Sequence, residues 1–367
     1  MRIDIQLSVV LFFVLILRSQ GEAATQVEQN DWQWNLPHDV DPPFVPENNP
    51  MSSAKVELGR ELFFDSNLSG AGYVSCSTCH LPERSFSENR KVSVGITGEF
   101  HTRNALSLVN TAYMTTLTWA DPNITLFEEQ AKVPMFGTHP IEMGTLGYEN
   151  KVLNFLSEHP LYPDKFKAAF PKRDTIDFEQ VFMALGAYQR TLISVNAPYD
   201  QYRYYGQKDA ISEAAIKGEA LFFSKELGCS GCHAGRHFSD ATGQPSFHNT
   251  GLYNVDKKGS YPQGEQGLFE VTNVDSDKGK FRTPTLRNIE LSAPYMHDGS
   301  INTLEEVIAH YAAGGRSAME TSDSPLRDIR ISGFELSDRE ASYLIEFLKS
   351  LTDTSYIENQ MRNAPFQ

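Results

Sequence analysis

The stretch "YVSCSTCH" (Tyr73–His80) contains a C-x-x-C pair with a histidine directly behind it. The pattern returns in "CSGCH" (Cys229–His233), and the two motifs use all four cysteines of the 367-residue chain. Disulfides within each pair would close small rings that restrict the unfolded chain little, so they would stabilise the fold only slightly. A zinc site is a second possibility, because C-x-x-C pairs often bind that metal. Neither explains why a histidine follows each pair.

The sequence C-x-x-C-H is the attachment site of c-type haem, in which two thiols bond the porphyrin and the histidine binds its iron. Two copies that consume every cysteine predict two covalently bound c-type haems. The predicted attachment residues are Cys76, Cys79, Cys229 and Cys232, and the predicted proximal ligands are His80 and His233.

The N-terminus is typical of a signal peptide over residues 1–23. Arg2 precedes an apolar run from Leu7 to Leu17, and small residues follow around Ala23. The run is too short to span a bilayer as a mature helix, although an uncleaved anchor is the alternative. We therefore expect a periplasmic protein with no membrane span in the mature chain. The formal net charge of −15 makes nucleic acid an improbable partner and fits a positively charged protein surface better.

The surroundings of the two motifs resemble each other. Residues 57–88 parallel residues 215–240, each with a helical pattern that ends in Leu-Phe-Phe before the motif and Phe-Ser-acid after it. Residues 102–130 likewise resemble 283–311. The segments "FEQVFMALGAYQRTLI" and "REASYLIEFLKSLT" both have the apolar spacing of an amphipathic helix.

These echoes predict a mainly α fold with two cytochrome c-like haem domains related by internal duplication. The expected boundaries are an extended lead-in over 24–50, an N-terminal peroxidatic domain over 51–205 and a C-terminal electron-transfer domain over 206–367. Trp32 and Trp34 of the lead-in are interpreted as structural.

With its two haem motifs, "TRNALSL", "EEQAKVP", "PIEMG" and "TPTLRNIELSAPYMHDG", the chain resembles the bacterial di-haem cytochrome c peroxidase superfamily, which includes MauG and MbnH. The resemblance implies that the N-terminal haem reacts with hydrogen peroxide while the C-terminal haem stores or relays electrons. It assigns the acid–base role to Glu142 of "PIEM". Gln130 would orient peroxide or water with its side-chain amide, and Pro134 would pack beside the open face of the iron.

Two departures from the usual family pattern concern the iron ligands. The position of a removable histidine on the first haem falls near Ile96, which is not a ligand, so that haem is expected to be five-coordinate. His101 belongs to the "HTRN" turn, and His139 is a weaker candidate for distal chemistry. The methionine that usually caps the second haem is replaced by Tyr311, as in MauG-like enzymes, with Met296 and His310 as rival ligands.

The resemblance also implies a tryptophan between the haems, matched by Trp119, although the usual "WDGR" reads "WADP" here. A calcium ion between the haems would be held at Asn104, Ser292 and Pro294, where the family usually has threonine at the second position. Oxygen ligands of this kind suit calcium.

Together these features predict an exported di-haem peroxidase-type oxidoreductase. The tyrosine ligand favours the MauG/MbnH branch, which uses high-valent haem iron to oxidise aromatic residues of a partner protein. The alternatives are a conventional cytochrome c peroxidase fed by a small cytochrome or cupredoxin, a plain electron-transfer cytochrome, and a zinc or disulfide protein. A homodimer is possible in either peroxidase branch.

Overall fold

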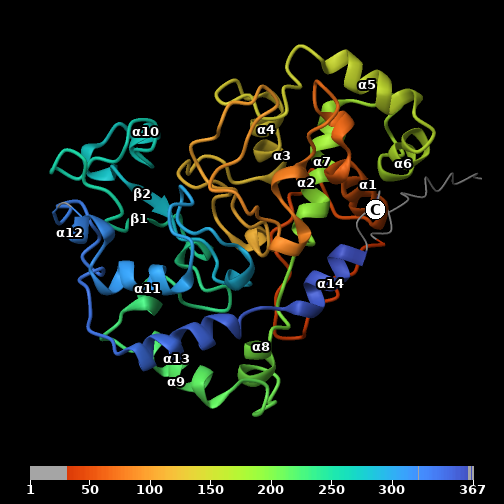
Figure 1. Cartoon of the computed structure of the whole chain (residues 1–367). Coiled ribbons are helices and arrows are strands. Elements are labelled where there is room, and N and C mark those ends of the chain that lie inside the picture. Colours follow the sequence, from red (N-terminus) through yellow and green to blue (C-terminus); the bar gives the residue numbers. More distant parts are fainter. Residues whose placement is uncertain (1–30, 321, 363–364, 366–367) are drawn as a thin grey trace, which may run out of the picture.

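The computed structural model describes residues 31–320, 322–362 and 365, and it is mainly helical (Figure 1). The α-helices of the first half are α1 Ser53–Phe64, α2 Cys76–Cys79, α3 Phe127–Gln130, α4 Lys132–Phe136, α5 Glu149–Glu158, α6 Tyr162–Ala169 and α7 Phe178–Arg190. Short 3₁₀ turns interrupt the loops between them: η1 Ser66–Leu68, η2 Pro82–Arg84 and η3 Thr111–Tyr113. The predicted mainly α fold is confirmed.

The second half repeats this style of long loops between helices. Its α-helices are α8 Pro198–Arg203, α9 Glu213–Phe222, α10 Phe269–Thr272, α11 Leu304–Ala312, α12 Arg316–Glu320, α13 Asp338–Lys349 and α14 Thr354–Arg362. Its 3₁₀ turns are η4 Cys229–Gly231, η5 Asp240–Thr242, η6 Asp275–Asp277 and η7 Ile289–Leu291. In the described part of the chain, the strands β1 Phe247–Asn249 and β2 Lys280–Arg282 form an antiparallel pair with Phe247 opposite Arg282.

Each half has a helix pair that crosses at a glycine. A Cβ on Gly59 of α1 would lie 1.9 Å from the Ala184 carbonyl oxygen of α7, and one on Gly218 of α9 would lie 1.9 Å from the Tyr343 carbonyl oxygen of α13. Only a residue without a side chain allows backbones to approach this closely. Both glycines lie three residues before the leucine of the shared Leu-Phe, so the parallel placement supports the predicted duplication.

Two hydrophobic cores form around these helix pairs. The buried members of the first run from Leu58 to Leu192, and those of the second lie mainly between Tyr199 and Leu351. Tyr199 precedes the predicted boundary at residue 206, so the α8 segment packs with the second core. Trp119 and Ala120 belong to the first half of the sequence but also pack in the second core.

Both ends of the described chain bridge the two halves. In the lead-in, residues 31–50 contain neither helix nor strand, and Asp39 pairs with Arg236 of the second half. Helix α14 leaves α13 and returns toward α1 (Figure 1), where it contacts η2 and places Tyr356 against the first core. The predicted signal peptide lies outside the described residues. None of the described helices has the length and apolar character that a membrane crossing requires.

Candidate haem and peroxide sites

The first C-x-x-C-H motif borders a cavity of about 350 Å³. Cys76, Cys79 and His80 all line it, because α2 carries the cysteines and His80 ends that helix. The His80 Nδ1 lies 2.8 Å from the Phe86 carbonyl oxygen, which can only accept a hydrogen bond. Nδ1 must therefore carry the proton, and the Nε2 lone pair is left for a metal. Burial lowers the pKa of His80, which favours this neutral form.

The second motif has the same arrangement beside a cavity of about 210 Å³. The His233 Nδ1 lies 3.0 Å from the Phe238 carbonyl oxygen, and burial lowers the pKa of this imidazole too. Phe86 and Phe238 both take left-handed backbone conformations, with φ of 55° and 50°, which turn their carbonyls toward the imidazoles. Such a carbonyl is a common orienting partner of a metal-binding histidine.

The structure brings the four predicted catalytic residues to the first cavity. Gln130 ends α3, Pro134 lies in α4, Glu142 follows in the next loop, and Trp119 closes another side. Burial raises the pKa of Glu142 to about 7, a value at which a carboxylate can accept and return a proton near neutral pH. His139 is exposed and does not line the cavity.

Helix α3 is anchored by a buried ion pair that sequence reasoning missed. The Arg190 Nη2 of α7 lies 2.7 Å from a Glu128 oxygen, and the Asn49 amide donates to the same carboxylate at 2.6 Å. The side chain of Arg190 is only 2% exposed. These contacts fix the helix that presents Gln130. The partners are 62 positions apart in the chain, so no local pattern could have indicated the pair.

The Glu142 segment is held by the loop that contains Ile96. The Ile96 backbone N–H donates to the Glu142 carbonyl at 2.8 Å, and a Cβ on Gly95 would lie 2.1 Å from the Ile141 carbonyl oxygen. Ile96 itself packs against the first hydrophobic core. The position where related enzymes were expected to carry a removable ligand therefore supports the Glu142 loop instead.

Two of the three candidate sixth ligands line the second cavity, namely Tyr311 and Met296. His310 does not, and its Nδ1 accepts a hydrogen bond from the Arg316 backbone N–H at 2.9 Å. Its Nε2 must then carry the proton of the neutral ring, so it offers no lone pair. Burial raises the pKa of Tyr311 above its ordinary value, and no hydrogen-bond partner of its hydroxyl is found among the described residues.

Trp119 lies between the two motif cavities and borders both. Its indole Nε1 donates to the Asn104 carbonyl at 2.8 Å, and its own carbonyl accepts from the Arg282 backbone N–H at 2.7 Å. Its ring is thus held by the first half of the chain and its backbone by the second.

Arg282 gives an independent test of whether the second cavity fits a haem. Its side chain lines this cavity, is fully buried, and forms no ion pair with a carboxylate of the described chain. Burial lowers the pKa of Arg282 to about 10. A buried guanidinium normally requires an anionic partner. The propionate groups of a haem would supply one, so the residues present fit that cofactor.

The predicted calcium residues Asn104, Ser292 and Pro294 line a third cavity of about 60 Å³. The Asn104 Nδ2 donates to the carbonyls of Arg90 and Lys91, which leaves its Oδ1 as a possible ligand. Carbonyl and amide oxygens suit calcium. The described lining contains no carboxylate and includes the cation Arg282, so the fit is weaker than that of the haems.

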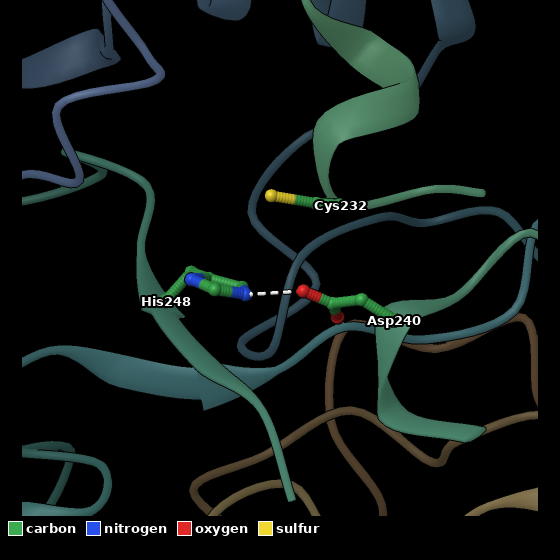
Figure 2. A group of neighbouring side chains, drawn as sticks. All are labelled: Cys232, Asp240 and His248. Atoms are coloured by element: carbon green, nitrogen blue, oxygen red, sulfur yellow. Dashed lines mark hydrogen bonds and ion pairs between the residues drawn. The ribbon is translucent and has the colours of Figure 1, made fainter. Parts of the chain in front are cut away.

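Cys232, Asp240 and His248 form a cluster next to the second motif (Figure 2), with ligand atoms within 4.8 Å of one another. His248 lies between Asp240 at 2.7 Å and Asp328 at 2.8 Å, and the Arg330 guanidinium is 2.6 Å from its Nδ1. That cation opposes a metal ion, and Cys232 is a predicted haem attachment residue. We interpret the cluster as an ionic support of the motif rather than as a zinc site.

Known proteins match this chain over most of its length. The family model for the di-haem cytochrome c peroxidases matches residues 53–209. The chain is 36% identical to the methylamine utilization protein MauG of Methylorubrum extorquens, over 83% of this chain and 80% of that protein. It is 34% identical to the cytochrome-c peroxidase IdrP1 of Denitromonas iodatirespirans, over 84% of each chain.

Among solved structures, a MauG-like protein associated with microbial copper homeostasis superposes with a TM-score of 0.86 at 42% identity. The match covers 92% of this chain and all of the other. The chain therefore belongs to the di-haem cytochrome c peroxidase family and is a haem peroxidase-type oxidoreductase, as the sequence analysis predicted.

Proposed function

We propose that the protein carries two covalent c-type haems, one on each C-x-x-C-H motif, and that the first is the site of reaction with hydrogen peroxide. The observation that carries the proposal is the convergence of Glu142, Gln130, Pro134 and Trp119 on the cavity beside His80. The haem, when bound, would supply the iron centre that passes electrons to peroxide.

Glu142 is the proton-transfer group of this cavity. As a carboxylate it accepts a proton from one peroxide oxygen, and as an acid it returns that proton to the other oxygen, which leaves as water. Gln130 offers an amide that can donate to peroxide and accept from it, which orients the molecule. Pro134 contributes an apolar ring that keeps the open side free of competing ligands.

The second site is proposed to favour the MauG-like branch. Tyr311 reaches the second cavity with a hydroxyl free of hydrogen bonds in the described chain, and a phenolate oxygen stabilises oxidised iron better than a thioether does. Trp119 borders both cavities and is proposed to carry electrons between them. The substrate would be an aromatic residue, chiefly tryptophan, on a partner protein in the periplasm.

A conventional peroxidase that takes electrons from a small redox protein is the second candidate. Met296 also lines the second cavity and could supply the thioether of such an enzyme. The 34% identity to a cytochrome-c peroxidase also favours this candidate.

Electron paramagnetic resonance and peroxide titration of the as-isolated diferric protein distinguish the candidates. The proposal predicts one high-spin and one low-spin haem, an immediate reaction with peroxide, and a changed low-spin signal in Tyr311→Phe. Methionine ligation and a need for pre-reduction would support the conventional peroxidase, with fast turnover of reduced cytochrome c. Two six-coordinate haems that ignore peroxide would contradict both. Calcium at Asn104, Ser292 and Pro294, and a homodimer, remain predictions that metal analysis and light scattering address.

A further inference from the structure

We propose that His101 is a positioning residue for Glu142. The His101 Nε2–H faces the Glu142 carboxylate across the mouth of the first cavity. The inference rests on the proposed peroxide chemistry of that cavity. The His101 Nε2 lies 3.8 Å from the Glu142 Oε1, and both side chains line the cavity. Sequence reasoning placed His101 only in a turn.

The proton on Nε2 follows from the other ring nitrogen. The Arg103 backbone N–H, which can only donate, lies 2.8 Å from the His101 Nδ1. Nδ1 must therefore be the acceptor, and in the neutral ring Nε2 carries the proton. Burial and the nearby Arg103 charge lower the pKa of His101, so the ring is neutral at pH 7. This tautomer is the opposite of the one that His80 adopts as an iron ligand.

The loop that carries His101 also carries the support of Glu142. The His101 backbone N–H donates to the Ser93 carbonyl at 2.9 Å, and Val94 pairs with Phe100 in an isolated bridge. Gly95 and Ile96, within the same loop, contact the backbone of residues 141–142. One rigid loop thus fixes the imidazole and the carboxylate relative to each other.

The other charged groups at the cavity do not compete for Glu142. Arg103 pairs with Glu270 at 2.6 Å and Glu265 at 3.3 Å, and Asp121 accepts from the Asn123 amide at 2.9 Å. No ion pair joins Glu142 to a described residue other than His101. The separation of 3.8 Å is about 1 Å longer than a hydrogen bond, and such contacts often shorten when a ligand enters an active site.

The side chains of His101 and Glu142 are 28% and 29% exposed, so the pair lies where solvent meets the cavity. A donor on one carboxylate oxygen stabilises the ionised form and directs the second oxygen inward. The proton that Glu142 takes from peroxide is the one that it returns, and His101 keeps its Nε2 proton throughout. His101 therefore positions the base and is not itself consumed.

Two substitutions of His101 distinguish the acceptor role of its Nδ1 from the donor role of its Nε2. His101→Asn keeps an acceptor for the Arg103 backbone N–H but removes the donor to Glu142. His101→Gln keeps a donor near the Nε2 position but displaces the acceptor. The matched control is His139→Asn, since His139 is exposed on a neighbouring loop and does not line the cavity.

Each variant is measured as the purified diferric holoprotein, by stopped-flow reaction with peroxide and by cyanide binding between pH 5 and 9. Hydrogen cyanide must lose its proton to bind ferric iron, so its binding reports on the distal base without turnover. For His101→Asn we expect binding to slow about three- to tenfold at pH 6, with the pH profile moved upward by about half a unit to one unit. His101→Gln and His139→Asn should stay near wild type.

Wild-type kinetics in His101→Asn, with slow kinetics in Glu142→Gln, would overturn the role of His101 while leaving the proposed function intact. Equal losses in His101→Asn and His101→Gln would also overturn it, because the effect would then be structural. If Glu142→Gln itself reacted at the wild-type rate, the proposed function would fail, and the inference with it.

Discussion

The raised pKa of Glu142 leads to a quantitative prediction about pH. With a pKa of about 7, the carboxylate is about one tenth ionised at pH 6 and about nine tenths ionised at pH 8. In the proposed function, the ionised form is the one that accepts the peroxide proton. The second-order rate of the diferric protein with peroxide should therefore rise about ninefold between these two pH values. An unperturbed glutamate, with a pKa near 4.5, would give almost no change over this range.

Replacement of Glu142 should lower the rate of reaction with peroxide and abolish the pH dependence of that rate. In Glu142→Gln the amide keeps the shape but accepts no proton, so we expect a loss of about 10²- to 10⁴-fold at pH 8. Glu99→Gln is the matched control, because Glu99 is exposed in the neighbouring loop. The assay is stopped-flow absorbance at the Soret band with peroxide in excess.

The same shift has a consequence for stability, and its sign follows from proton binding. Between pH 4.5 and 7 the folded protein holds a proton on Glu142 that the unfolded chain has released. The contribution of Glu142 to the free energy of unfolding is therefore fully present below pH 4.5, the unfolded pKa. This contribution is lost as pH rises toward 7, the folded pKa. Glu142→Gln should unfold at a temperature that depends less on pH across this window.

For the rate prediction, a flat peroxide rate between pH 6 and 8 in the wild type would refute the reasoning.

Three further predictions concern residues that connect or support the two sites. Trp119→Phe should leave the peroxide rate unchanged but slow the later spectral change of the second haem several-fold, which rapid-scan spectroscopy can follow. Gly218→Ala should destabilise the holoprotein by about 1–3 kcal/mol in thermal unfolding, because its Cβ would meet the Tyr343 carbonyl oxygen at 1.9 Å. Glu128→Gln should cost about 3 kcal/mol by leaving the buried Arg190 without its counter-ion, and should lower peroxide reactivity with it.

The helices with strong local patterns could be predicted from sequence. The segments "FEQVFMALGAYQRTLI" and "REASYLIEFLKSLT" correspond to α7 and α13, with ends that differ by a few residues because short capping contacts decide where a helix ends. The haem motifs were evident for the same reason, since their chemistry depends on residues within one turn of each other.

Long-range contacts of polar groups could not be predicted in this way. The pairing of Glu128 with Arg190, and of His248 with Asp328 at 80 positions' separation, depends on how loops meet in space. The tautomer of His101 depends on a single backbone N–H, and the unpaired charge of Arg282 is apparent only once its burial is known. Sequence spacing carries none of this information.

The return of α14 to the first half has a consequence for how the protein matures. The helix covers η2, which begins two residues after His80, and Tyr356 packs against the first core. A chain made from its N-terminus can form this contact only after residues 354–362 have been synthesised. Until then η2 and the part of the first core against which Tyr356 packs stay uncovered, so the first half completes its packing last.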